Sequence, residues 1–329
     1  MKTRRSNARV PVLFPVLALA VALGACRGAP ETEPSPKPPS DRPYLVVLGI
    51  AQDAGVPQAG TREHPAWDDS SRRRMAVCLG MVDPRSGRRF LFEPTPDFKW
   101  QLRRLDRVAP PVGPVPGLDG VFLTHAHMGH YLGLAWLGHE SIGAKGVPVY
   151  AMPRMATYLS ENGPWDQLVR YGNVELQPMS AGEPVELASD LRVMPILVPH
   201  RQEYSEVVAY RIEGPEQSVL FLPDIDSWKE WDALGTRLED VLDTVDVAYL
   251  DATFYANGEI PGRDMSGFPH PFITTTMSRL GDRSAEDRAQ VRFIHFNHTN
   301  PALDPDSPER AAVLERGFRL AEELEIVPL

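Results

Sequence analysis

The chain has 329 residues, with 44 acidic residues against 34 lysines and arginines and a net charge of −10 at pH 7. Nucleic acids and anionic lipid surfaces require a basic binding face, so this balance argues against either as the partner. Only two cysteines occur, Cys26 and Cys78. If Cys26 carries a lipid, Cys78 has no partner for an intrachain disulfide, and its apolar surroundings predict a buried structural thiol.

Residues 1–25 have the order of a secretory signal peptide. Four basic residues and no acidic residue precede Cys26, and the apolar run 10–25 contains two prolines. This run is shorter than the roughly 20 apolar residues that a membrane span needs. The run ends in Leu23–Cys26 (LGAC), which resembles the lipobox of bacterial lipoproteins, where the cysteine is lipidated. An ordinary cysteine after a small-residue cleavage site is the alternative.

Residues 26–43 are expected to form a lipidated, proline-rich linker. Six prolines occur between Gly28 and Pro43, and such a stretch favours an extended, semi-rigid spacer. We expect the chain to be lipid-anchored in the bacterial cell envelope, facing the periplasm or the exterior, with no other membrane contact. One folded domain, residues 44–329, is then left, which is acceptable for a two-sheet enzyme.

Short apolar runs alternate with helical patterns through this domain. Strands are expected at 44–50, 75–82, 89–92, 118–124, 147–152, 174–178, 191–198, 207–212, 218–222, 245–250 and 292–296. Helices are expected at 97–108, 227–241 and 307–314. No period of about 20 to 50 residues repeats, which excludes a solenoid or propeller. Many strands with interspersed helices predict a mixed α/β protein with two sheets.

Three histidines follow the expected strand at Val121–Leu123: His125, His127 and His130. Alternation places His125 and His127 on one side of an extended segment, and a turn can bring His130 to join them. Imidazole is a common ligand of zinc and iron. The alternative is a polar loop with unrelated histidines, since short motifs carry that risk of a false match.

The segment Thr124–His130 (THAHMGH) resembles the His-x-His-x-Asp-His motif of the metallo-β-lactamase superfamily. The resemblance implies an α/β fold of the metallo-β-lactamase type, an αββα four-layer sandwich with a metal site at one edge. It also implies later ligands: a histidine and an aspartate after two strands, and a histidine near the last strand. His200, Asp224 and either His295 or His298 occur in that order.

In the family pattern two metal ions share a carboxylate. The pattern assigns His125, His127 and His200 to the first ion, Asp224 to the bridge, and His130 with the late histidine to the second ion. Gly129 stands where the family has aspartate, so the second ion is expected to lack its own carboxylate and to be weakly held. An aspartate there would add a ligand, unless φ is positive at this glycine. We expect one or two divalent ions, zinc first, with iron or manganese as alternatives.

The outlying ligands have competing interpretations. His200 could belong to a surface loop. Asp226 competes with Asp224 and could instead cap the helix that follows. Asp251, at the end of another strand, is a second candidate for the bridging carboxylate.

The remaining histidines are less well determined by the sequence. His295 lies at a strand end and His298 in the loop beyond it, and the sequence does not decide between them. His270, between two prolines, could line the pocket as a proton donor, although a rigid loop also explains it. His64 and His139 follow no pattern and are expected to be solvated.

Three segments resemble coenzyme PQQ synthesis protein B-like members of the superfamily: residues 49–58, 143–155 and 293–301. Two departures stand out. Those biosynthetic proteins lack the His-x-His pair that this chain has at the first motif. Their early cysteines have no counterpart here between Ala59 and Trp67. We therefore expect a relative with a more hydrolase-like metal site.

The expected function is a metal-dependent hydrolase of a small-molecule ester, amide, lactone or phosphodiester. Its nucleophile would be metal-bound water, whose pKa an ion lowers from 15.7 to about 7. Two alternatives remain. One is an iron-dependent redox enzyme like PQQ synthesis protein B, and the other is a non-catalytic binding module that contains metal.

The lipid anchor can be tested directly. Replacing the cysteine that is expected to carry the lipid, Cys26→Ser, should release the protein from membranes or leave it unprocessed, because serine lacks the thiol of the lipobox cysteine. Membrane fractionation and metabolic labelling with a fatty acid measure the effect. Unchanged membrane association and processing would contradict the lipoprotein interpretation.

Overall fold

The computed structural model describes residues 37–329. The expected signal peptide, Cys26 and most of the proline-rich linker fall outside these residues and stay predictions. Within residues 37–329, none of the helices combines the length and apolar character that crossing a membrane requires.

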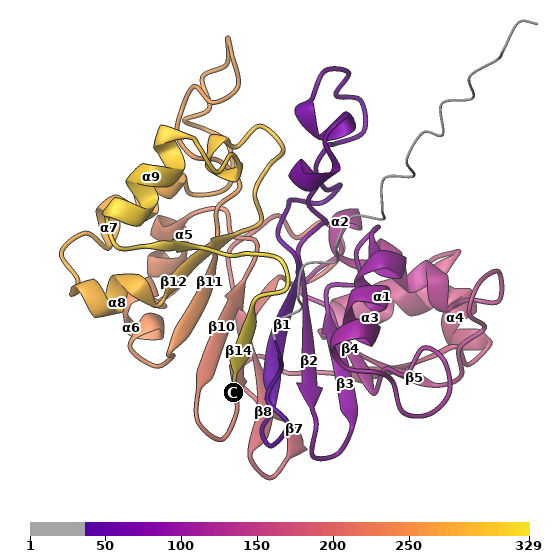
Figure 1. Cartoon of the computed structure of the whole chain (residues 1–329). Coiled ribbons are helices and arrows are strands. Elements are labelled where there is room, and N and C mark those ends of the chain that lie inside the picture. The colour runs from indigo at the N-terminus through magenta and orange to yellow at the C-terminus, as the bar shows by residue number, and fades with distance from the viewer. Residues whose placement is uncertain (1–36) are drawn as a thin grey trace, which may run out of the picture. The chain divides into compact units, whose positions relative to one another are not determined.

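Two mixed sheets of seven strands each pack face to face, and helices cover the outer face of each sheet (Figure 1). This arrangement confirms the expected αββα four-layer sandwich. The first sheet has the order β14 (Ile326–Pro328), β1 (Tyr44–Gly49), β2 (Cys78–Asp83), β3 (Arg88–Phe92), β4 (Gly120–Phe122), β5 (Val147–Ala151) and β6 (Val174–Pro178). Strands β3 to β6 run parallel, and the others pair antiparallel.

The second sheet mirrors this plan. Its order is β13 (Arg319–Leu320), β12 (Val291–Ile294), β11 (Val247–Asp251), β10 (Ser218–Leu222), β9 (Val208–Glu213), β8 (Leu191–Leu197) and β7 (Val185–Ala188). Strands β10 to β13 are parallel, and β7 to β10 are antiparallel. Each sheet therefore contributes a parallel half whose carboxyl ends can carry a site.

Helices pack on each outer face (Figure 1). The first sheet is covered by α1 (Phe98–Val108), α3 (Pro153–Glu161) and α4 (Trp165–Arg170). The second carries α5 (Trp228–Ala233), α6 (Leu238–Leu242), α7 (Ile273–Arg279), α8 (Ala285–Ala289) and α9 (Pro308–Glu315). The shorter segments are α2 (Met128–Tyr131) and the 3-10 turns Pro65–Trp67, Ser70–Arg72, Leu132–Leu137 and Pro301–Leu303.

Strand β1 shows why its sequence is apolar throughout. Leu45 and Val47 join the core between the two sheets, whereas Val46 and Leu48 pack with the helices outside the first sheet. A strand covered on both faces needs apolar residues at every position. Cys78, at the start of β2, is fully buried as expected, and burial raises the pKa of its thiol.

One expected helix is wrong. The segment 227–241 forms two helices, α5 and α6, because Gly235 adopts φ of 90° between them. This left-handed conformation ends a right-handed helix, and glycine adopts it readily.

Candidate metal centre

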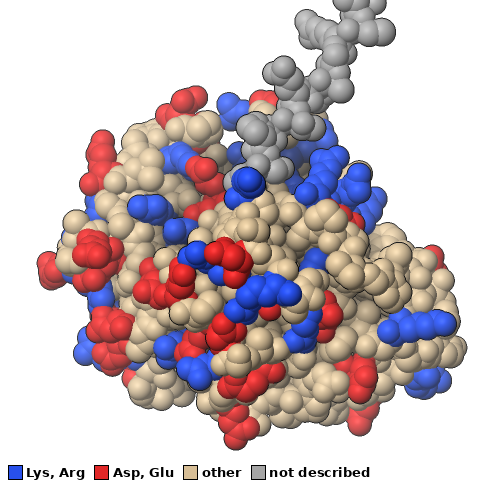
Figure 2. Space-filling view, turned by 60° about the horizontal axis from the view of Figure 1, so that its bottom comes forward, with Lys and Arg blue, Asp and Glu red and all other residues tan. Residues whose placement is uncertain are grey.

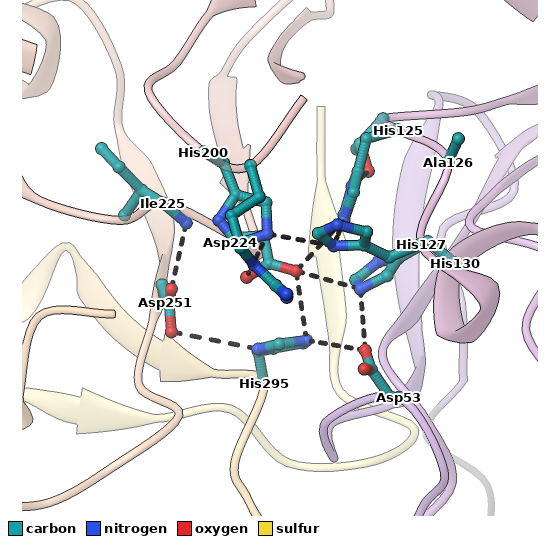
Figure 3. Close-up of polar contacts among 12 residues, drawn as sticks. Asp53, His125, Ala126, His127, His130, His200, Asp224, Ile225, Asp251 and His295 are labelled. Carbon is teal, nitrogen blue, oxygen red and sulfur yellow. Dashed lines mark hydrogen bonds and ion pairs between the residues drawn. The ribbon is translucent and has the colours of Figure 1, made fainter. Parts of the chain in front are cut away.

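Loops from both sheets converge at one edge of the sandwich. Glu93 follows β3 and the three-histidine segment follows β4, both in the first sheet. Asp224, Asp251 and His295 lie at the carboxyl ends of β10, β11 and β12 in the second sheet. The carboxyl ends of parallel strands meet at one edge of a sheet. The two parallel halves thus place polar side chains from distant parts of the sequence in one buried space (Figure 3).

The first group contains His125, His127, His200 and Asp224. His127 Nδ1 lies 2.8 Å from His125 Nε2 and 3.1 Å from His200 Nε2. Asp224 closes the group, with its oxygens 3.5 Å from His125 Nε2 and 3.6 Å from His200 Nε2. Ligands about 2.0 Å from a tetrahedral zinc ion are ~3.3 Å apart. These separations therefore fit a single ion.

The second group contains Asp53, His130, Asp224 and His295. His130 Nε2 lies 3.0 Å from both Asp53 Oδ1 and Asp224 Oδ2. His295 Nε2 lies 3.7 Å from the same two oxygens. The four atoms thus surround a second space of the size that one ion needs.

Asp224 belongs to both groups and is buried to 3% exposure. Figure 3 shows it between the rings of the first group and those of the second. Burial alone would raise the pKa of Asp224, but the surrounding histidines outweigh burial and hold it well below its ordinary value. The carboxylate is therefore charged and placed to bridge.

The competing carboxylates have other partners. Asp226 Oδ1 lies 2.6 Å from His200 Nδ1 and orients that ring. Asp251 accepts hydrogen bonds from the backbone N–H of Ile225 and of Thr253, which hold both of its oxygens. Of the three candidates, only Asp224 lies in the space common to the two groups.

Each histidine of the two groups has one ring nitrogen held by an outer polar group. The pairs are His125 with Thr124, His127 with Glu203, His130 with Glu93, His200 with Asp226, and His295 with Thr253. Such partners fix the ring and leave the other nitrogen to face the metal. Burial also lowers the pKa of His125 and of His127, which favours the neutral imidazole that can bind an ion.

Two buried atoms argue against a metal-free hydrogen-bonded cluster. Among the described residues, His295 Nε2 has no hydrogen-bond partner. Asp224 Oδ1 has none either, because the His270 Nδ1 atom 3.1 Å from it is bonded to Asp251 at 2.7 Å. A buried polar atom without a partner costs about 1–3 kcal/mol. Both atoms belong to the groups above, so metal ions there would satisfy them. The clusters are consistent with a binuclear metal site.

Backbone strain is concentrated at the same place. Among residues 37–329, five residues other than glycine have positive φ: Asp53, Glu93, His270, His295 and Leu324. All except Leu324 contribute side chains to the centre or its outer hydrogen bonds. Strained conformations of this kind persist where the surrounding structure enforces them, and they cluster at functional sites.

The structure places the remaining histidines individually. His270 Nδ1 lies 2.7 Å from Asp251 Oδ2 and 3.1 Å from Asp224 Oδ1, beside both groups. With Asp224, Asp251 and His295, His270 forms a third group that could hold an ion. His298 lies outside all three groups and contacts His64, whose Nε2 is 3.1 Å from the His298 carbonyl oxygen. His139 is exposed beside Tyr171. His295, not His298, is therefore the late histidine that the structure brings into the cluster.

Sequence reasoning missed Asp53. The expectation of a second position without its own carboxylate is wrong, because Asp53 reaches it from the loop after β1. Gly129 does not have a positive φ, so the backbone strain that the sequence left open as an obstacle to aspartate there does not apply. In the sequence, Asp53 stood out only as part of the segment 49–58, which resembles PQQ synthesis protein B-like proteins. Nothing in the spacing connected it to His130, 77 residues away.

A cleft of about 680 Å³ opens beside the centre. Its lining includes Arg201, Trp228, Lys229, Phe268, His270 and Phe272. Asp226, which holds His200, also lines it. The cleft therefore reaches from the surface to the edge of the two ligand groups.

The chain matches the family profile described as the beta-lactamase superfamily domain over residues 88–296, more than half of its length. The chain belongs to the metallo-β-lactamase superfamily. The matched segment contains the ligand set from His125 to His295 but ends before His298.

Curated relatives of this superfamily member include coenzyme PQQ synthesis protein B from two bacteria. The Bradyrhizobium diazoefficiens protein is 26% identical, and the match covers 86% of this chain and 99% of that protein. The Methylorubrum extorquens protein is 28% identical, with 85% and 98% covered. The expected similarity to PQQ synthesis protein B is thus confirmed.

Solved structures share the fold. Zinc-bound PqqB from Methylobacterium extorquens superposes with a TM-score of 0.69 at 23% identity, covering 87% of this chain and all of that chain. A diphosphatase of the PhnP family superposes with a TM-score of 0.60 at 22% identity, covering 88% and 97%. At these identities the comparison establishes the fold alone.

Removal of the paired histidines tests the first group. The double variant His125→Ala/His127→Ala should lose one tightly bound ion, because two of four donors disappear. His139→Ala is the matched control, since this exposed histidine lies outside the cluster and should leave metal content unchanged. Metal analysis after dialysis measures both. A double variant with full metal content would show that the ion is not bound here.

Proposed function

We propose that the protein is a metal-dependent hydrolase of a small-molecule ester, amide, lactone or phosphodiester. The observation that carries the proposal is the buried Asp224 carboxylate shared by two histidine-rich groups. Divalent ions held there would supply a nucleophile by lowering the pKa of water, and would polarise the substrate oxygen. Zinc is the expected metal, with iron or manganese as alternatives.

The protein's own side chains would position the substrate and move protons. His270 lines the cleft and is held through Nδ1 by Asp251, 2.7 Å away. A histidine oriented in this way can donate a proton to a leaving group at the mouth of the centre. Asp251 would act as a positioning residue, because its oxygens are themselves held by backbone N–H groups.

The shape and charge of the surface support a small substrate. The cleft volume of about 680 Å³ lies within the usual range for small-molecule sites. Trp228, Phe268 and Phe272 offer apolar contact, and Arg201 and Lys229 offer positive charge. On the face drawn in Figure 2, acidic and basic side chains are interspersed over much of the surface. This mixture of charges and the net negative charge argue against nucleic acid as the partner, because nucleic acid binding requires a basic face.

Turnover by the metal-loaded protein tests the proposal. Zinc- and iron-loaded samples are assayed against esters, lactones, amides, phosphodiesters and diphosphates. The diphosphates are included because a diphosphatase shares the fold. We expect hydrolysis that is lost with chelation and reduced about 10²–10⁴-fold in kcat by His270→Gln at unchanged metal content. His139→Gln serves as the control.

Two outcomes would contradict this proposal. Oxygen-dependent turnover only with iron would favour a redox enzyme. Tight metal binding with no turnover of any substrate class would favour a binding module.

A further inference from the structure

Gly129 and Asp53 occupy one space. A Cβ atom on Gly129 would lie 2.4 Å from Asp53 Cα and 2.5 Å from Asp53 Oδ1. Both distances are far below any tolerated contact with a Cβ, and the nearest atom is backbone. The glycine is therefore required by space, and the space it leaves is filled by a carboxylate.

The two positions also lead to the same point beside His130. A carboxylate oxygen is two bonds from its Cβ, so an aspartate at 129 could place an oxygen near the present position of Asp53 Oδ1. That oxygen lies 3.0 Å from His130 Nε2 and 3.7 Å from His295 Nε2. The charge missing from the histidine motif thus reappears at the second ligand group, supplied from a different loop.

The loop that carries Asp53 is held against the end of β12. The backbone N–H of Gln52 donates to Phe296 O at 2.8 Å, and that of Phe296 donates to Ile50 O at 2.9 Å. The Asn297 side chain donates to Gln52 Oε1 at 2.7 Å. These bonds keep Asp53 in its unusual conformation, with φ of 25°. They also tie it to the strand end that carries His295.

We infer that Asp53 is the terminal carboxylate ligand of the second metal ion, in exchange for the aspartate absent at position 129. The carboxylate ligand is thus relocated from position 129 to position 53. Asp53 provides the charge, and Gly129 leaves the space that the Asp53 side chain occupies. The inference rests on the metal centre of the proposed function but not on hydrolysis. Metal binding without turnover would leave it standing.

Four forms of the full-length protein separate the alternatives: Asp53→Gly, Asp53→Asn, Gly129→Asp, and the double variant Asp53→Gly/Gly129→Asp. Zinc stoichiometry and affinity are measured by competition with a chromophoric chelator. Cobalt absorption spectra report the coordination of each ion. Asp68→Asn, an exposed carboxylate, is the matched control.

We expect the unmodified protein to bind two ions. Asp53→Gly and Asp53→Asn should keep one and weaken the other more than about 100-fold, because even outer partners of a ligand contribute 10–100-fold. Gly129→Asp alone should also weaken the second ion, because its side chain collides with Asp53. The double variant removes the contacts with Asp53 Oδ1 and Cβ and restores the charge, while the Cα of residue 53, 2.4 Å from the new Cβ, must still shift. We therefore expect its affinity for the second ion to rise about tenfold or more above that of Asp53→Gly.

Two results would overturn the inference. One is unchanged affinity for both ions in Asp53→Asn. The other is a folded double variant, shown by thermal unfolding, that binds the second ion no better than Asp53→Gly. If the double variant does not fold, the Asp53→Asn measurement decides alone.

Discussion

A single buried carboxylate organises this protein. Asp224 lies within 3.7 Å of ring nitrogens from both sheets, and at 3% exposure bulk solvent screens its charge only weakly. An isolated charge in such a place is strongly disfavoured, so it requires partners of opposite charge. The histidines and the ions they can hold meet this requirement. The rest of the centre is arranged around it.

The αββα sandwich makes it possible to surround Asp224 with histidines from both sheets. Each sheet presents the carboxyl ends of its parallel strands at the same edge, and each half alone supplies an incomplete ligand set. His125, His127 and His130 come from the first sheet, whereas His200, Asp224 and His295 come from the second. In the core between the sheets, the Phe92 ring stacks on Phe122 with ring centroids 4.8 Å apart and contacts Tyr210 edge-on. This packing fixes the distance between the two sheets. Packing thereby determines ligand spacing.

The sequence predicted those features that depend on neighbouring residues and missed those that depend on contacts between distant segments. The apolar runs of β1 and β10 and the three-histidine motif are local patterns, and the sequence predicted them correctly. His200 and Asp224 were predicted from the order of ligands in the family pattern. The edge strands β7, β13 and β14 have only four, two and three residues, which is too short to show a period. Gly235 divided an apparently continuous helix. Asp53 was missed because its role depends on a contact between loops, and the space at Gly129 can be seen only in three dimensions.

The most direct test is crystallographic. Anomalous scattering from a zinc-loaded crystal locates each ion independently of any assay. A bridging Asp224 predicts two peaks about 3.5–4 Å apart, the usual separation in two-metal sites, on either side of that carboxylate. One peak should lie among His125, His127 and His200, and the other near His130 and His295. A single peak at full zinc occupancy, or two ions too far apart to share Asp224, would contradict the account.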